Sequence, residues 1–226
     1  MDWAANRSDT NRQPPLLTTK LHVARIPPNY VSRARLHERL NEGLKRRLTV
    51  ISAPSGFGKT TLICGWMQQG KINAAWVSLD EGDNQPARFW AYLIGSLQQL
   101  QPRLGTRALN LLNSSDSLPI EGILTELIND LVEVAGQIAV VLDDYHVIEN
   151  EEIHATLSLF IERMPSQLHI YIPSRVDPPL RLTRLRARGE LIEIRASELQ
   201  FTFQEAAPFV NSSPEIALSS DEVSEL

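Results

Sequence analysis

Small residues surround a lysine and a threonine in the segment 53–60, Ala-Pro-Ser-Gly-Phe-Gly-Lys-Thr. Backbone N–H groups can converge on phosphate oxygens only where side chains are small, so this composition is typical of a phosphate-binding loop. We expect the Lys59 amine to reach the β- and γ-phosphates of a nucleotide and the Thr60 hydroxyl to coordinate Mg²⁺. The other residues expected to contact the nucleotide are Pro54, Ser55, Gly56, Phe57, Gly58 and Thr61.

Two adjacent carboxylates follow the apolar run Ile-Ala-Val-Val-Leu at residues 138–142. Carboxylates at the end of a buried strand are costly unless a cation meets them. We expect Asp143 to hold Mg²⁺, directly or through water, and Asp144 to orient or deprotonate the attacking water. The alternative is a solvated turn, because acidic pairs are common after strands.

A serine and an arginine, Ser174 and Arg175, follow the apolar run at residues 168–172 in the same way. An arginine in that place would stabilise charge in the transition state or report the state of the nucleotide, and a surface ion pair is the alternative. For His146 we expect only structural placement. A basic run follows, for which we favour a solvated face with inward leucines over a phosphate clamp or a partner contact, and its arginines are Arg181, Arg184, Arg186 and Arg188.

Short apolar runs alternate with helical stripes along the chain. Strands are predicted at residues 48–53, 74–79, 138–142, 168–172 and 191–194. Helices are predicted at residues 35–48, 60–69, 86–100, 120–131 and 153–164. This alternation implies right-handed crossovers between parallel strands, and therefore an α/β fold of the P-loop NTPase kind with a mostly parallel sheet and helices on both faces. The carboxyl ends of its strands would line the ligand crevice.

Composition narrows the classes of function. The chain of 226 residues has 22 basic and 27 acidic residues, and this excess of negative charge argues against binding of nucleic acid by this chain. Its single cysteine allows no intrachain disulfide, and its histidines lack metal-ligand spacing. We find neither a signal peptide nor a membrane-spanning run, so we expect no membrane partner and a cytoplasmic protein. The chain lacks the Asn-Lys-x-Asp run of guanine pockets, which favours ATP and ADP as ligands.

Three regions are predicted from these patterns. Residues 1–19 are polar and read as a flexible tail, and residues 20–200 form the ATPase domain. Residues 201–226 begin a helical or winged-helix continuation, in which Thr202 and Glu205 have the spacing of a capping box.

Taken together, the motifs resemble the N-terminal ATPase domain of the MalT-like, LuxR-type transcriptional activators, which are signal-transduction ATPases of the STAND class. The resemblance runs from about residue 20 to the end, and it is most particular at Leu-Asp-Glu-Gly-Asp-Asn-Gln-Pro-Ala-Arg-Phe-Trp, residues 79–90, and at residues 174–191. Its other blocks are residues 20–27, 53–62 and 141–146.

The resemblance implies an ATP-controlled switch with slow hydrolysis, which rests with ADP and assembles with ATP and an inducer. It therefore also implies self-association. It assigns Arg175 to the position that senses the γ-phosphate, and it places the segment around Val31, Ser32 and Arg33 near the adenine.

Three departures from the family pattern stand out. Pro173 occupies a position where the family has a small or hydroxylated residue, and Pro208 falls inside an expected helix, where a proline costs about 3 kcal/mol outside the first turn. Family members also continue into winged-helix, inducer-binding and helix-turn-helix parts. We therefore expect a truncated product, a split gene or an excised domain, in which DNA is bound only through domains outside this chain. A free-standing small-molecule kinase and a non-functional remnant are the alternatives.

Overall fold

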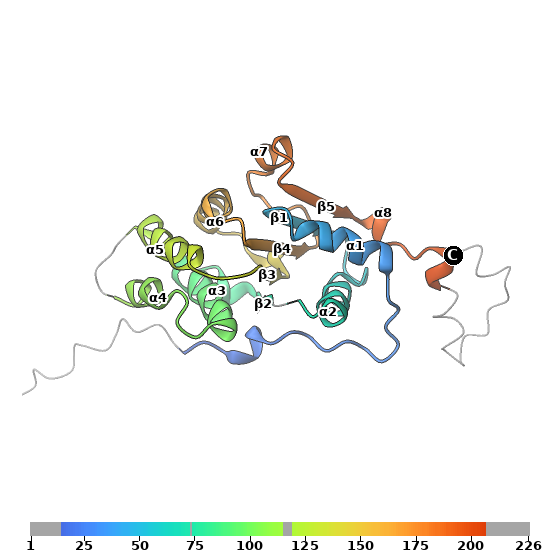
Figure 1. Ribbon diagram of the computed structural model, residues 1–226, viewed down its shortest axis with the longest axis horizontal. Helices are drawn as coiled ribbons and strands as arrows, with labels where there is room; N and C mark the ends of the chain where they lie inside the picture. Colours follow the sequence, from blue (N-terminus) through green and yellow to red (C-terminus); the bar gives the residue numbers. More distant parts are fainter. Residues whose placement is uncertain (1–14, 73, 115–118, 207–226) are drawn as a thin grey trace, which may run out of the picture.

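Five parallel strands form one sheet in the structure, a computed structural model that describes residues 15–72, 74–114 and 119–206. The order across the sheet is β2-β3-β4-β1-β5 (Figure 1). The strands are β1 (Leu48–Ser52), β2 (Ala74–Ser78), β3 (Ile138–Asp143), β4 (Leu168–Ser174) and β5 (Leu191–Arg195). All five predicted strands are confirmed. The predictions for residues 1–14 and 207–226, including that for Pro208, fall outside the described ranges.

Helices cover both faces of the sheet (Figure 1). One layer contains α1 (Ala34–Gly43), α2 (Lys59–Gly70) and the short α8 (Ala196–Leu199). The other contains α3 (Pro86–Leu100), α4 (Thr106–Leu112), α5 (Ile120–Val132), α6 (Glu151–Arg163) and α7 (Leu182–Ala187). Three single 3-10 turns complete the described elements: η1 (Thr18–Leu21), η2 (Glu81–Asp83) and η3 (Tyr145–Val147). The α/β class with two helical layers is therefore confirmed.

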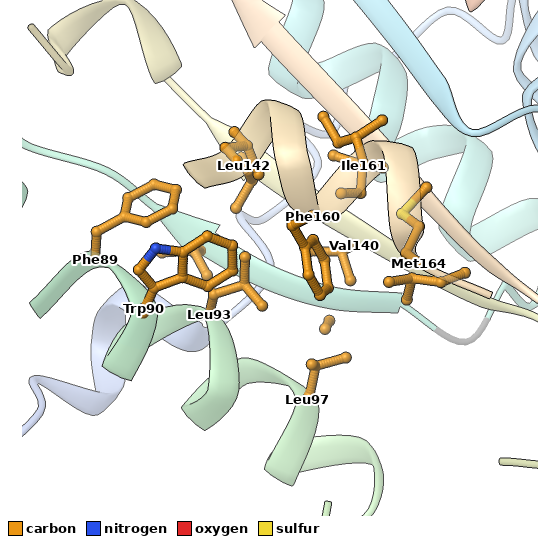
Figure 2. Close-up of a cluster of buried hydrophobic side chains, with 14 of the residues drawn as sticks. Phe89, Trp90, Leu93, Leu97, Val140, Leu142, Phe160, Ile161 and Met164 are labelled. Atoms are coloured by element: carbon orange, nitrogen blue, oxygen red, sulfur yellow. The ribbon is translucent and has the colours of Figure 1, made fainter. Parts of the chain in front are cut away.

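The central strands read as continuous apolar runs because both of their faces are buried. In β3, Val140 and Leu142 join the larger core under α3 and α6, whereas Ala139 and Val141 join the smaller core under α1 and α2. The larger core contains a cluster of aromatic rings in which Trp90 of α3 meets Phe160 of α6 edge-on, with centroids 5.2 Å apart (Figure 2). This packing holds α3 and α6 against β3, and it therefore also fixes the position of the carboxylates that end β3.

A methylene deletion tests that packing. Ile161 lies in the same core and is 1% exposed (Figure 2). We expect Ile161→Val to lower the free energy of unfolding by about 1 kcal/mol, because the lost methylene leaves a small cavity. Val132→Ala, at a side chain that is 55% exposed, should change it by less than about 0.5 kcal/mol. Urea unfolding of both variants measures the difference, and equal losses would contradict the assigned core.

Several elements differ from the prediction. The helix predicted at residues 35–48 ends at Gly43, where a Cβ atom would lie 2.3 Å from Thr49 Oγ1. α1 therefore packs directly against β1 at this residue, and residues 44–47 form the turn that connects the two elements. The helices α4, α7 and α8 were not predicted, because their seven, six and four residues hold too short an apolar stripe to show a helical period.

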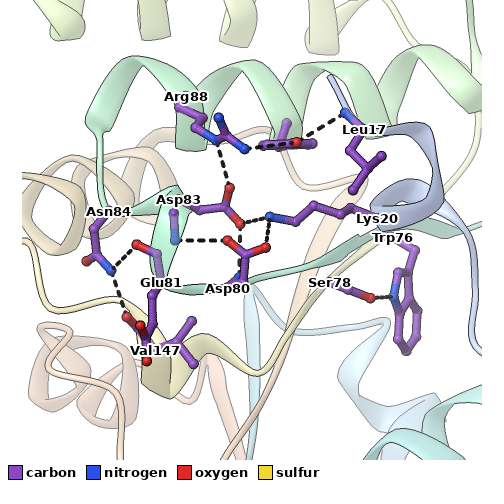
Figure 3. Close-up of polar contacts among 12 residues, drawn as sticks. Leu17, Lys20, Trp76, Ser78, Asp80, Glu81, Asp83, Asn84, Arg88 and Val147 are labelled. Atoms are coloured by element: carbon purple, nitrogen blue, oxygen red, sulfur yellow. Dashed lines mark hydrogen bonds and ion pairs between the residues drawn. The ribbon is translucent and has the colours of Figure 1, made fainter. Parts of the chain in front are cut away.

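The N-terminal segment is fastened to the edge of the sheet by buried charges (Figure 3). The Lys20 side chain is 7% exposed and pairs with Asp83, which is fully buried, and with Asp80 at 2.9 Å. Arg88 of α3 pairs with Asp83 from the other side at 3.2 Å. These contacts fix the loop between β2 and α3. The same segment is also held at Leu17, whose N–H donates to the Tyr92 hydroxyl at 3.1 Å.

Candidate nucleotide-binding site

The loop between β1 and α2 has the backbone that a phosphate cradle needs. Gly56 and Gly58 have φ values of +88° and +72°, a left-handed conformation that glycine adopts without strain. A Cβ atom built at either glycine would have no neighbour within 4 Å, so the surface above the loop is open. At the start of α2, the amides of residues 59–61 have no carbonyl partner in the part of the chain that the structure describes. Free amides at a helix start are suited to bind an anion.

Lys59 begins α2 and lies across the loop. Its side chain is buried, and its amine donates to the carbonyl oxygens of Ala53 at 2.7 Å and Pro54 at 2.9 Å. Burial lowers the pKa of Lys59, and the nearby carboxylates of Asp144 and Asp143 oppose that shift. The amine and both carboxylates therefore share one site, as the sequence predicts.

Thr60 and Asp143 face each other across the site. The Thr60 hydroxyl lies 3.1 Å from each carboxylate oxygen of Asp143, which is 5% exposed at the end of β3. Hard oxygen ligands of this kind suit Mg²⁺, which usually takes one or two protein oxygens and completes its shell with phosphate and water. Among the described residues, no group of three His, Cys, Asp or Glu side chains could hold a metal alone. The pair therefore fits a nucleotide-bound Mg²⁺ rather than a separate metal centre.

Burial, followed by the charge of Asp144, raises the pKa of Asp143 to about 6. This pKa lies above the unfolded value, so the folded protein favours the protonated form of Asp143. The contribution of that protonated form to the free energy of unfolding is complete below pH ~4 and is lost as pH rises through ~6. We therefore expect Asp143→Asn to raise the free energy of unfolding by about 2 kcal/mol at pH 8 without Mg²⁺. The gain should shrink towards zero at pH 4. Urea titrations of parent and variant at both pH values measure it, and a gain independent of pH would contradict the buried carboxylate.

Asp144 turns away from the sheet immediately after Asp143. Its φ of +57° is left-handed, an uncommon conformation for a residue with a side chain. Its N–H donates to Asp143 Oδ1 at 3.1 Å, and its own carboxylate is 52% exposed. The turn thus separates the two carboxylates: that of Asp143 is buried against Thr60, whereas that of Asp144 faces open space.

An open pocket of about 370 Å³ lies beside Asp144 at the carboxyl edge of the sheet. Asp144 and Arg175 both line it, so the structure brings these two predicted residues together. The other lining residues come from the loops after β2 and β3, and they are Leu79, Asp80, Glu81, Gly82, His146 and Val147. The sequence interpretation gave His146 and this acidic loop no part in the site. Their sequence signals were the position of both segments after predicted strands and their inclusion in the resemblance blocks 79–90 and 141–146.

The end of β4 also reaches the site. The strand continues through Pro173 to Ser174, so the proline does not interrupt it. Ser174 is fully buried, and its hydroxyl has no hydrogen-bond partner among the residues that the structure describes. Its carbonyl accepts from the N–H of Ala53 at 3.2 Å, which joins β4 to the first residue of the loop.

Val31 and Arg33 lie before α1. The Arg33 guanidinium is 4% exposed and donates to the carbonyl oxygens of Leu199 and Gln200 at 2.7 and 2.8 Å. Val31 is half-buried. Arg33 thus holds the segment after β5, and its predicted place beside the adenine remains a prediction.

The basic run lies on and around α7. Arg184 pairs with Glu162 at 3.3 Å and Arg186 with Glu193 at 3.0 Å, both from exposed positions. Leu182 and Leu185 are buried beneath them. The favoured interpretation, a solvated face with inward leucines, is confirmed.

The capping box at residue 202 is also confirmed. The Thr202 N–H donates to a Glu205 carboxylate oxygen at 2.9 Å, and the Glu205 N–H donates to the Thr202 hydroxyl at 3.3 Å. Within the described ranges, no helix has the length and apolar character that a bilayer crossing requires.

The chain is similar to HTH-type transcriptional regulators named MalT. It is 36% identical over 194 residues to the regulator of Serratia proteamaculans, a match that covers 86% of this chain and 21% of the relative. For Cronobacter sakazakii the identity is 37% over 179 residues, with 79% and 20% covered. The chain thus spans about a fifth of the length of these relatives. No protein-family model matches it.

Two solved structures share the fold. A signal transduction ATPase with numerous domains and a tetratricopeptide repeat sensor, from Pyrococcus horikoshii, has a TM-score of 0.53 at 14% identity and covers 90% of this chain and 28% of its own. A Walker-type ATPase of Pyrococcus abyssi has a TM-score of 0.51 at 15% identity and covers 87% and 62%. These likenesses and the all-parallel sheet identify a P-loop NTPase fold.

Proposed function

We propose that this chain, which is related to the MalT transcriptional regulators over about a fifth of their length, is an ATP-binding switch module that hydrolyses ATP slowly. The observation that carries the proposal is the meeting of Thr60 and Asp143 at 3.1 Å beside the Lys59 amine. If the loop were a plain turn and the aspartates a solvated pair, no function would explain why a hydroxyl, a buried carboxylate and an amine lie together.

Each residue has a distinct part in this function. The loop amides and Lys59 bind the phosphates, and Thr60 and Asp143 hold Mg²⁺. When bound, Mg²⁺ neutralises charge on the phosphate oxygens. Asp144 orients the attacking water and accepts its proton, and Arg175, in the same pocket, stabilises the charge that develops on the γ-phosphate.

The relatives favour a switch over a small-molecule kinase. The kinase alternative needs a mobile basic lid, but Arg184 and Arg186 are already paired with glutamates. We propose further that ATP and ADP select different assembly states and that DNA is contacted through segments outside this chain, in a cytoplasmic protein. Sedimentation with ATP and with ADP tests the first of these statements.

The products of ATP turnover distinguish the functions. A switch should release inorganic phosphate and ADP at about 10⁻² s⁻¹ or more slowly, with no phosphoryl acceptor needed. Radiolabelled γ-phosphate, followed with and without a panel of small-molecule acceptors, measures this. Transfer of the label to an acceptor at about 1 s⁻¹ or faster would establish the kinase instead.

A further inference from the structure

His146 is the nearest partner of the proposed water-orienting carboxylate. Its Nδ1 atom lies 3.8 Å from Asp144 Oδ1, and the imidazole is 15% exposed. That nitrogen is buried and has no hydrogen-bond partner among the residues that the structure describes. Buried polar atoms in folded proteins are nearly always paired, so an unpaired nitrogen beside a carboxylate asks for an explanation.

The electrostatic surroundings of His146 place it inside the phosphate site. Burial is the main cause that lowers the pKa of His146. Asp144 opposes this shift, whereas Arg175 and Lys59 add to it. The ring is therefore within electrostatic range of the lysine, the carboxylate and the arginine that the proposed reaction uses. A neutral imidazole with its proton on Nδ1 can donate to a carboxylate without adding charge to this site.

The Asp144 carboxylate has few contacts that would fix its orientation. The side chain is 52% exposed, and its carboxylate accepts no hydrogen bond in the described part of the chain. A hydrogen bond to Nδ1 requires a donor–acceptor distance of about 3 Å, so a rotation that moves the carboxylate by less than about 1 Å closes the contact. An exposed carboxylate has the freedom to make that rotation.

The backbone around His146 is held by hydrogen bonds on both sides. His146 lies in η3, and Asn84 connects this turn to the loop after β2: its amide donates to the Val147 carbonyl at 2.8 Å (Figure 3). The same Asn84 side chain accepts from the Glu149 N–H at 2.7 Å. On the preceding side, the Tyr145 hydroxyl is hydrogen-bonded to His154 Nδ1 at 2.8 Å inside the core. An exposed carboxylate thus lies beside an imidazole whose backbone is held on both sides.

We propose that His146 is a positioning residue: its Nδ1–H donates to the Asp144 carboxylate and turns it towards the water that attacks the γ-phosphate. The inference rests on the proposed ATPase function. It adds a residue for which the sequence suggested only structural placement.

Two amides test the proposal because they mimic different ring nitrogens. The Asn amide nitrogen occupies the place of Nδ1, and that of Gln occupies the place of Nε2. We expect His146→Gln and His146→Leu to slow single-turnover hydrolysis of ATP about tenfold or more, whereas His146→Asn should stay within about threefold of the parent. The dissociation constant of ATP should change little in all three. His22→Asn, at an exposed histidine outside the site, is the matched control.

A double-mutant cycle separates positioning from general support of the fold. In an Asp144→Asn background, His146→Leu should cause no further loss, because the group that it orients is gone. Equal rates for the parent, His146→Gln and His146→Leu would overturn the proposal, as would an undiminished tenfold loss in the Asp144→Asn background. If the parent itself binds ATP but never hydrolyses it, the proposed ATPase function fails, and this inference with it. Thermal unfolding of each variant confirms that the comparison is between folded proteins.

Discussion

Replacement of Lys59 by alanine is expected to weaken ATP binding about 100-fold or more. The amine is buried at the start of α2 and lies across the mouth of the loop, where a triphosphate would meet it. Hydrogen bonds between charged partners contribute about 1.5–3 kcal/mol each, and a factor of 100 corresponds to about 2.7 kcal/mol. Calorimetric titration with Mg²⁺ and ATP measures the change.

A second lysine supplies the control for this experiment. Lys45 is exposed in the turn between α1 and β1, so Lys45→Ala removes the same charge without touching the loop. Its ATP affinity should equal that of the parent. If Lys59→Ala also binds ATP as well as the parent does, the loop is not a working phosphate site, and the remnant interpretation is correct.

Asp144→Asn is expected to have the largest effect on turnover. General bases contribute about 10²–10⁴-fold to the rate of proton transfer, so hydrolysis should fall by at least about 100-fold. The affinity for ATP should stay within about threefold of the parent, because Asp143 and Thr60 still hold the metal and the Asp144 carboxylate is half-exposed. Single-turnover measurement of phosphate release with saturating ATP gives the rate.

The exposed Glu133, at the end of α5, provides the matched substitution. Glu133→Gln removes one negative charge far from the loop and should leave turnover unchanged. A fall in affinity for Asp144→Asn that matches its fall in rate would instead assign Asp144 to the binding of the nucleotide.

The parts of the fold that could be predicted are those with local patterns. A strand buried on both faces, such as β3, must be apolar throughout, and the carboxylates that follow it must lie at the ligand edge of a parallel sheet. The loop could be predicted because its glycines are a local backbone requirement. Thr60 and Asp143 are 83 residues apart, yet both follow parallel strands, whose carboxyl ends lie at one edge of the sheet.

Contacts that depend on the packing of distant segments could not be predicted. Nothing local in the sequence pairs Lys20 with Asp83, which lie 63 residues apart, or directs the Arg33 guanidinium to the backbone after β5. The close approach of Gly43 to Thr49 likewise depends on how α1 packs against β1. For His146, the relevant property is a buried nitrogen without a partner, and this cannot be read from residue spacing.

The most direct test of the central claim is a crystal structure of the chain with Mg²⁺ and a non-hydrolysable ATP analogue. We predict that the metal lies about 2.1 Å from Thr60 Oγ1, with Asp143 bound to it directly or through one of its waters, and that the Lys59 amine contacts the β- and γ-phosphates. A nucleotide bound elsewhere on the sheet, or a metal held without Thr60 and Asp143, would contradict the account.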